Sequence, residues 1–186
     1  SWSERFLASY FQAVTPRTAG FNTLEMSDLM PATLFFLLLL MFIGASPGGT
    51  GGGIKTTTFI ILVMSVLSTT HGKGRIEIRQ RSVPPRLVPK SAAVALLSLF
   101  VVVIVTLILL LSEGTDLLTA LFETVSAFAT VGLSVGLTPE LSILGRLVIA
   151  ALMFAGKIGP LTLAVAIAQR QEMNHVEYPE EQLVVG

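Results

Sequence analysis

A short motif that could coordinate a cation occurs twice in this chain of 186 residues. It consists of threonine, one further residue, glycine and a large apolar residue, at residues 18–21 (Thr-Ala-Gly-Phe) and, 112 positions later, at residues 130–133 (Thr-Val-Gly-Leu). Backbone carbonyl oxygens can replace the water around an ion when a turn points several of them the same way, and glycine permits such a turn. The two copies therefore predict two strips of carbonyl oxygens along one ion path.

The motif thus gives a set of candidate ion-binding residues. A bare Thr-x-Gly is common in turns, so its weight comes from the short helix predicted before it, the apolar span after it and the duplication. The candidates are Thr18, Ala19, Gly20, Phe21, Thr130, Val131, Gly132 and Leu133. The carbonyl oxygens expected to contact the ion are those of Thr18, Ala19, Gly20, Thr130, Val131 and Gly132.

The similarity between the two halves extends beyond the motif. At the same offset, residues 41–44 (Met-Phe-Ile-Gly) match residues 153–156 (Met-Phe-Ala-Gly). Upstream, residues 11–15 resemble residues 122–126, with one extra residue before the second motif. A repeat of this kind predicts two copies of one structural unit, which consists of a short helix, the turn and a long second span.

Short helices are predicted over residues 3–15 and 117–129, directly before each motif. Each is too short to cross a bilayer, so we expect it to descend part way, which is tolerated where irregular backbone is buried in protein or lines water. Its C-terminal end carries partial negative charge and would favour a cation at the turn.

Composition places these elements in a membrane. Hydrophobic residues make up 52% of the chain, charged residues 13%, and the mean hydropathy is +0.78. Residues 91–112 carry no charge, and a buried helix of a soluble protein rarely runs so long without one. Cysteine is absent, the two histidines lie outside the apolar segments, and the net charge of zero gives no reason to expect nucleic acid as a partner.

No catalytic residue is expected, because no known catalytic pattern is present. Residues 48–56 superficially resemble a phosphate-binding loop, but Ile54 separates Gly53 from Lys55 and the preceding segment is apolar. The chain is therefore not predicted to be an enzyme.

The span after the first motif contains a glycine-rich interruption. Residues 31–43 are apolar, residues 48–53 include five glycines, and residues 59–67 are apolar again. Each glycine costs a helix about 1 kcal/mol relative to alanine, so the span is predicted to break near mid-membrane. The alternative is a Gly-x-x-x-Gly packing face between helices, but five glycines exceed what packing needs. The predicted gating residues are Gly48, Gly49, Thr50, Gly51, Gly52 and Gly53, together with Lys157.

Lys157 is included because it is a charge within an apolar span, where a lone ammonium usually faces a pore or a partner. Snorkelling to an interface is the alternative, and the distance to either interface disfavours it. The repeat places Lys157 level with Ala45, at the start of the glycine-rich segment, where it could contact Thr50.

A basic connector sets the predicted topology. Residues 71–90 carry six lysines and arginines and one acid, which predicts a cytosolic loop that lipid headgroups or a cytosolic subunit could also bind. Residues 113–116 and both motifs then face outside. The alternating residues 76–78 (Ile-Glu-Ile), with Pro84, Pro85 and Pro89, indicate an extended connector and not another helix.

Four regions follow from this organisation. Residues 1–70 form one pore repeat without its first span, 71–90 the connector, 91–170 the next repeat and 171–186 a cytosolic tail. We expect the chain to be a fragment of a longer multi-pass protein of the cell membrane.

The chain resembles the Trk/Ktr/HKT superfamily of potassium transporters, most closely its bacterial KtrB-type membrane subunits. The resemblance covers nearly the whole chain and is carried by residues 15–22, 44–58, 129–134 and 156–160. It implies an all-α integral membrane protein with span, pore helix, filter and span repeats around a pseudo-fourfold ion pore, of which the third and fourth are present here.

The resemblance also implies how the pore works and with what it assembles. K⁺ would be the transported ion, held by the carbonyls of the two motifs, and the broken span would gate the pore, with a basic residue beneath the filter. Lys157 keeps the charge of the arginine often found there but not its planar fork. The implied partners are the missing N-terminal half of the protein, a second copy in a homodimer, membrane lipid and a cytosolic nucleotide-binding regulatory ring (KtrA-like). ATP or ADP is expected on that ring, Na⁺ as an activating ion, and no cofactor in this chain.

Three interpretations remain open: a potassium transporter subunit, another monovalent cation channel or carrier, and a non-conducting membrane scaffold. The paired motifs favour the first two, and the resemblance separates the first from the second.

Overall fold

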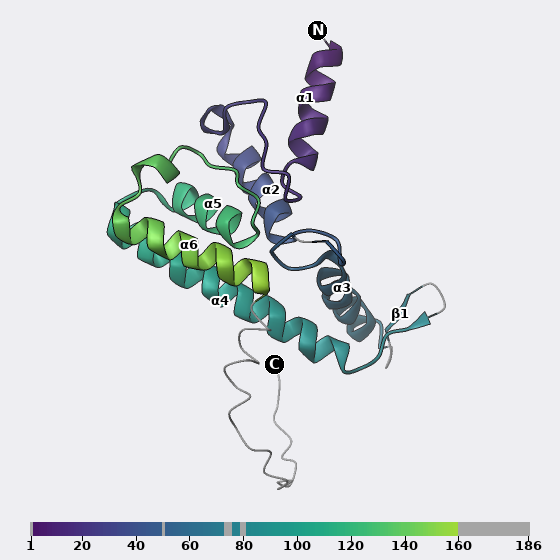
Figure 1. Cartoon of the computed structure of the whole chain (residues 1–186). Coiled ribbons are helices and arrows are strands. Elements are labelled where there is room, and N and C mark those ends of the chain that lie inside the picture. The colour runs from purple at the N-terminus through teal and green to yellow at the C-terminus, as the bar shows by residue number, and fades with distance from the viewer. Residues whose placement is uncertain (1, 50, 73–75, 79–80, 160–186) are drawn as a thin grey trace, which may run out of the picture.

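The chain folds into helices, several of which pack around one short helix, while the N-terminal helix projects away from them, as a computed structural model shows (Figure 1). The structure describes residues 2–49, 51–72, 76–78 and 81–159. In chain order the elements are α1 (Trp2–Val14), the 3-10 helix η1 (Met26–Asp28), α2 (Pro31–Phe42), α3 (Thr56–Thr70), the strands β1 (Glu77–Ile78) and β2 (Arg81–Ser82), α4 (Leu87–Glu113), α5 (Leu117–Phe128), the 3-10 helix η2 (Thr138–Glu140) and α6 (Ile143–Ile158).

Some predicted features lie outside the described residues. They are Thr50 of the glycine-rich segment, the connector bases Lys73, Arg75 and Arg79, the end of the fourth repeat at residues 160–170 and the tail at residues 171–186.

The repeat seen in the sequence is also present in the order of the elements. Each unit runs through a short helix, the Thr-x-Gly motif, a 3-10 helix and a second helix. η1 begins at Met26 and η2 at Thr138, while α2 begins at Pro31 and α6 at Ile143, so both pairs of starts are offset by 112 residues. The fold is mostly helical, as predicted; the antiparallel pair β1–β2 lies in the basic connector.

α4 is the longest helix of the described residues. Its 27 residues extend about 40 Å, and by length and composition it is the one helix in the described part that could cross a membrane. It begins at Leu87 and not at residue 91, so Pro89 and Lys90 belong to the helix and not to an extended connector as predicted. The reason is that proline is tolerated in a first helical turn, where its missing N–H has no helical acceptor.

The helix after the first motif is broken where the glycines predict it. α2 ends at Phe42, α3 begins at Thr56, and no helix forms at residues 43–49 or 51–55. A Gly-x-x-x-Gly face between helices is therefore absent there. α6 ends at Ile158, before Gly159 with a φ of 92°, and the rest of the predicted fourth repeat lies outside the described residues. The following proline disfavours helical backbone at the residue before it.

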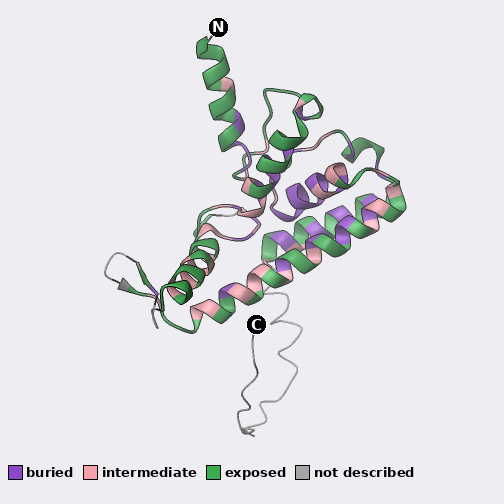
Figure 2. Cartoon of the chain, turned by 180° about the vertical axis from the view of Figure 1, so that it is seen from behind, coloured by how far each residue is buried: buried purple, intermediate pink, exposed green. Residues whose placement is uncertain are grey.

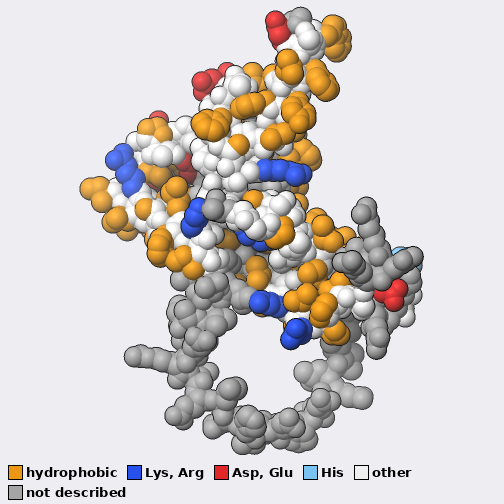
Figure 3. Space-filling view, turned by 45° about the vertical axis from the view of Figure 1, so that its right-hand side comes forward, with side chains coloured by type: hydrophobic (Ala, Val, Ile, Leu, Met, Phe, Trp, Pro, Cys, Tyr) orange, Lys and Arg blue, Asp and Glu red, His pale blue; other side chains and the backbone are white. Residues whose placement is uncertain are grey.

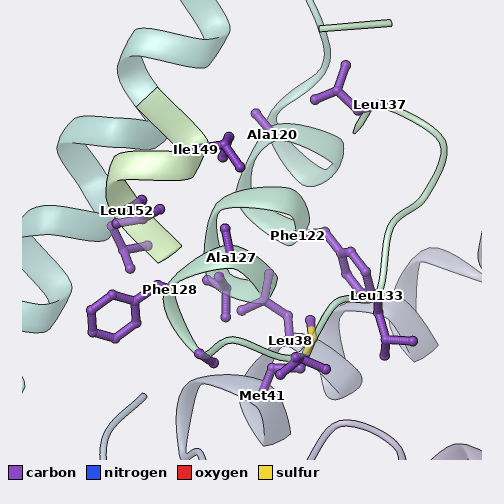
Figure 4. Packing of buried hydrophobic residues seen from close by; sticks show 14 of the residues in the cluster. Leu38, Met41, Ala120, Phe122, Ala127, Phe128, Leu133, Leu137, Ile149 and Leu152 are labelled. Atoms are coloured by element: carbon purple, nitrogen blue, oxygen red, sulfur yellow. The ribbon is translucent and has the colours of Figure 1, made fainter. Parts of the chain in front are cut away.

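The core forms around α5, which α2, α4 and α6 cover (Figure 4). Phe122 and Phe128 are 0% exposed and Val125 is 1% exposed. α1 differs, because Gln12 is its only buried residue and Trp2 is 87% exposed (Figure 2). Apolar side chains are spread over the molecular surface, with few charges between them (Figure 3). Such a surface is typical of one covered by lipid or by further protein.

Candidate ion-binding site

The two Thr-x-Gly motifs share an unusual backbone conformation. Thr18 has a φ of 65° and Thr130 a φ of 56°, and these are the only positive values outside glycine in the described residues. Gly20 and Gly132 are also positive, at 73° and 93°. A β-branched residue rarely adopts positive φ, and such outliers concentrate at functional sites. Because the same rare φ occurs at matched positions of both motifs, the two turns have the same backbone conformation.

Hydrogen bonds to the preceding helix orient each motif. The amide of Ala19 donates to the carbonyl oxygen of Thr15 (3.1 Å), and the amide of Val131 donates to that of Ser126 (2.9 Å). These bonds span four residues in the first unit and five in the second, in agreement with the extra residue seen in the sequence. In both motifs φ is positive at the threonine and at the glycine, so the backbone follows the same path through the two turns.

The two motifs lie side by side, although 112 residues separate them. A methyl group added to Gly20 would overlap the carbonyl oxygen of Val131, and one added to Gly132 would lie 3.9 Å from the Cα of Gly20. Only a glycine at position 20 permits this approach of one backbone to the other. The backbones of the two motifs are therefore in contact at Gly20, Val131 and Gly132.

The last residues of the two motifs differ in their surroundings. The side chain of Phe21 is 72% exposed, whereas that of Leu133 is 3% exposed and packs in the core near Phe122 (Figure 4). The hydroxyl of the buried Thr15 donates a hydrogen bond to the carbonyl oxygen of Phe21. That oxygen therefore already has a partner within the protein.

The glycine loop, defined as residues 44–55, contacts both motifs. The amide of Gly52 donates to Oγ1 of Thr130 at 2.8 Å. A methyl group added to Gly51 would lie 2.8 Å from Cγ2 of Thr18, so larger residues would not fit beside that threonine. At the end of α2, the carbonyl oxygen of Phe42 accepts a hydrogen bond from the amide of Ile54 in the loop, at 3.2 Å. The loop is thus closed at its base and touches the threonine side chains of both motifs.

Sequence reasoning did not select Lys55 as a site residue. This half-buried lysine donates a hydrogen bond from Nζ to the carbonyl oxygen of Gly51. The bond links the residue before α3 to the part of the loop that contacts Thr18. The signal in the sequence was a charge four residues after Gly51, at the border of an apolar helix.

Lys157, one of the predicted gating residues, lies near the loop but forms no hydrogen bond with its described residues. It is exposed in the last turn of α6, and its neighbour Gly156 is packed so closely that an added methyl group would overlap the carbonyl oxygen of Phe128. A methyl group added to Gly52 would lie 2.8 Å from the same oxygen. No hydrogen bond of Lys157 to the described part of the loop is present; Thr50 lies outside that part.

Comparison with known proteins shows the family of this chain. A family model described as "TrkH: Cation transport protein" matches residues 1–177. The chain is 45% identical over 183 residues to Ktr system potassium uptake protein B of Bacillus subtilis, covering 98% of this chain and 41% of that protein. It is 38% identical to the protein of the same name from Vibrio alginolyticus, covering 98% of this chain and 40% of the relative.

Two further matches extend the comparison. The chain is 35% identical to potassium/sodium uptake protein NtpJ of Enterococcus hirae, covering 100% of this chain and 43% of the relative. The crystal structure of the potassium transporter TrkH from Vibrio parahaemolyticus superposes with a TM-score of 0.76 at 24% identity, over 90% of this chain and 38% of that one. The chain thus spans about two fifths of the length of the curated relatives it matches. On the family match over residues 1–177, the chain belongs to the TrkH family of cation transport proteins.

Proposed function

We propose that this chain is part of the pore-forming subunit of a potassium uptake system in the cell membrane. The observation that carries the proposal is the pair of Thr-x-Gly motifs, which have the same rare backbone and lie side by side. The names of the similar proteins from B. subtilis and V. alginolyticus state potassium uptake, which supports K⁺ as the ion.

The ion would be held by the carbonyl oxygens of residues 18–20 and 130–132. α1 and α5 each end just before a motif, so the partial negative charge at their C-termini would add to the attraction for a cation. Carbonyl oxygens can replace the hydration shell of an ion without binding it too tightly to leave. Any further ion ligands would come from outside these two motifs.

The function is tested with the full-length protein in a bacterial strain that lacks its own potassium uptake. We expect K⁺ uptake to be restored, and Gly132→Ser to lower the ratio of K⁺ to Na⁺ flux. Ser82→Ala, in the connector, is the matched control. Flux of Na⁺ in preference to K⁺ would support the second interpretation, another monovalent cation carrier, for which the name of the E. hirae relative gives a reason. An assembled protein without any cation flux would support the scaffold.

We further propose that the glycine loop gates this path. Its contacts with Thr18 and Thr130 support a closed position directly beside both motifs. A segment so rich in glycine has little preference for one conformation, so a modest free energy can move it. Lys55 stabilises the closed position through Gly51. Lys157 would add positive charge near the same place and raise the barrier for a cation.

A cytosolic regulator would supply that free energy. The word "system" in the names of two relatives supports more than one component. We propose that the basic connector faces the cytosol, that the chain works as a homodimer and that a nucleotide-binding ring, with ATP or ADP, contacts it from that side. An activating Na⁺ is part of the same proposal.

Deletion of residues 48–53 tests the gate. The expected result is higher flux in vesicles and weaker dependence on the regulator. A structural loop would instead give lost assembly and lost flux, which size-exclusion chromatography of the detergent-purified protein detects separately. A well-assembled deletion variant with unaltered, regulated flux would refute the gate.

A further inference from the structure

Each unit buries one long polar side chain on the helix before its motif. These side chains are Gln12 in α1, which is 6% exposed, and Glu123 in α5, which is 5% exposed. They occupy matched positions in the repeated segments at residues 11–15 and 122–126. Gln12 is the only buried residue of its helix. Since burial of a polar side chain is costly unless it makes hydrogen bonds, packing alone does not explain these residues.

Both side chains reach the same place in the following 3-10 helix. Nε2 of Gln12 donates to Sδ of Met26 at 3.2 Å, and the hydroxyl of Thr138 donates to Oε1 of Glu123. Met26 and Thr138 are the first residues of η1 and η2 and are offset by 112 positions. In each unit one side-chain bond therefore joins the helix that enters the motif to the turn that leaves it.

We call each of these two side-chain hydrogen bonds a tether. In the second unit the tether is also connected to the residue directly after the motif. Oγ1 of Thr138 lies 3.2 Å from Oγ of Ser134, the residue directly after the motif. The same Ser134 oxygen accepts a hydrogen bond from the amide of Gly136 at 3.1 Å. Glu123 is thus connected through Thr138 to the segment in which the chain leaves the Thr-x-Gly turn.

Each tether also leaves one oxygen unused. Oε1 of Gln12 and Oε2 of Glu123 are buried without a hydrogen-bond partner in the described residues. An apolar side chain of similar shape would avoid this cost at either position. The repetition of the costly arrangement in both units indicates a role other than stability.

We propose that Glu123 and Gln12 are positioning residues that fix the width of the two Thr-x-Gly turns and thereby the discrimination between K⁺ and Na⁺. The inference rests on the proposed function and assigns neither side chain a contact with the ion. By joining the start of the turn to its end, each tether limits how far the carbonyl oxygens can move. K⁺ and Na⁺ differ in size, so a looser turn favours K⁺ less.

The two tethers differ in strength, so their removal should change ion selectivity to different extents. A hydroxyl donates strongly to a carboxylate, whereas the thioether sulfur of Met26 is a weak acceptor. The tether of the second unit should therefore matter more than that of the first.

The test uses the full-length protein in proteoliposomes, with K⁺ and Na⁺ uptake measured over a range of concentrations. Thr138→Val removes the donor at an exposed position with little change of shape. We expect it to lower the K⁺/Na⁺ flux ratio about fivefold, the effect of one lost hydrogen bond, and to raise the half-saturating K⁺ concentration. Thr138→Ser keeps the hydroxyl donor and Glu123→Gln keeps an oxygen acceptor, so the K⁺/Na⁺ flux ratio of both variants should stay within about twofold of the wild type. Met26→Leu, which removes the weaker tether of the first unit, should change this ratio less than Thr138→Val.

A merely structural role predicts a different result, in which Thr138→Val lowers the amount of assembled protein or the maximal flux while the ratio stays constant. That result overturns the proposal, as does an unchanged Thr138→Val variant. Glu123→Ala combined with Thr138→Val should be no worse than the stronger single variant, because both remove the same bond. K⁺ flux of the wild type in the same vesicles distinguishes a failure of the proposed function from a failure of the proposed positioning role. If it carries no K⁺, the proposed function and this inference both fall; if it does and Thr138→Val keeps its selectivity, only the inference falls.

Discussion

The amide of Gly52 and the hydroxyl of Thr130 join the two units of this chain by a 2.8 Å hydrogen bond across 78 residues of sequence. Gly52 belongs to the loop that interrupts the helix of the first unit, and Thr130 opens the Thr-x-Gly motif of the second. Movement of the loop away from the motif must break this bond. The bond therefore couples the position of the proposed gate to the proposed filter.

Thr130→Val is expected to favour the open position of the loop. The substitution keeps the shape of the side chain but removes the acceptor, and the amide of Gly52 is then left unpaired while the loop stays in place. A net contribution of about 1 kcal/mol corresponds to about a fivefold shift toward the displaced loop. Flux in the absence of the regulator, measured in vesicles with the full-length protein, should rise by a similar factor.

Thr130→Ser is the matched control for this bond, because it retains the hydroxyl. It should keep flux without the regulator near the wild-type level. If the valine and serine variants behave alike, the hydrogen bond does not restrain the loop, and the gate proposal loses its main contact.

Gly20→Ala is expected to be more harmful than Gly132→Ala. Both substitutions place a side chain at positive φ, which costs about 1–2 kcal/mol. Only at Gly20 would the new methyl group also overlap a backbone atom, the carbonyl oxygen of Val131. Gly132→Ala should therefore assemble and show altered K⁺/Na⁺ selectivity, whereas Gly20→Ala should reduce both assembly and uptake. Equal assembly and equal selectivity of the two variants would contradict the side-by-side placement of the motifs.

Much of the helix arrangement could be predicted, because helix starts and breaks depend on residues that are close together in the sequence. The start of α5 at Leu117 and the break between Phe42 and Thr56 follow from apolar runs and glycines, which act over a few residues. The offset of 112 residues likewise predicts the equivalence of the two turns. Helix ends were less accurate: α4 takes in Pro89, because a first turn does not need the proline N–H.

The contacts between distant segments could not be predicted in this way. Nothing local in the sequence distinguishes Gly52, which binds Thr130, from the neighbouring glycines, since the difference lies in what the fold brings beside each one. The role of Lys55 cannot be predicted for the same reason, because its partner is a backbone carbonyl group, that of Gly51, and every residue has one. The pairing of Gln12 with Met26 depends on how the chain runs from the first motif to η1, which no local pattern specifies.

Cysteine labelling can establish the topology, because the chain contains no cysteine of its own. Ser82 lies exposed in β2, and Asn22 lies exposed after the first motif. With a cytosolic basic connector, an impermeant thiol reagent on intact cells should label Asn22→Cys and leave Ser82→Cys unlabelled until the membrane is opened. Labelling of Ser82→Cys in intact cells would reverse the proposed orientation of the whole chain.

Lys55 and Lys157 should affect gating by different routes. The ammonium of Lys55 donates to the loop carbonyl of Gly51, whereas Lys157 is exposed and has no such bond in the described residues. Lys55→Met should therefore release the loop, raise flux and weaken dependence on the regulator about tenfold, since a hydrogen bond from a charged group contributes about 1.5–3 kcal/mol. Lys157→Ala removes positive charge near the path, so it should raise flux with a smaller loss of regulation.

The comparison of single and double variants decides whether the two lysines act separately. If Lys55 restrains the loop and Lys157 repels the ion, their effects on the free energy of activation should add in Lys55→Met/Lys157→Ala. Lys55→Arg should retain regulation, because its guanidinium can still donate to the Gly51 carbonyl. A Lys55→Met variant that assembles fully yet keeps wild-type regulation, while Lys157→Ala loses it, would show that Lys157 and not Lys55 stabilises the closed loop.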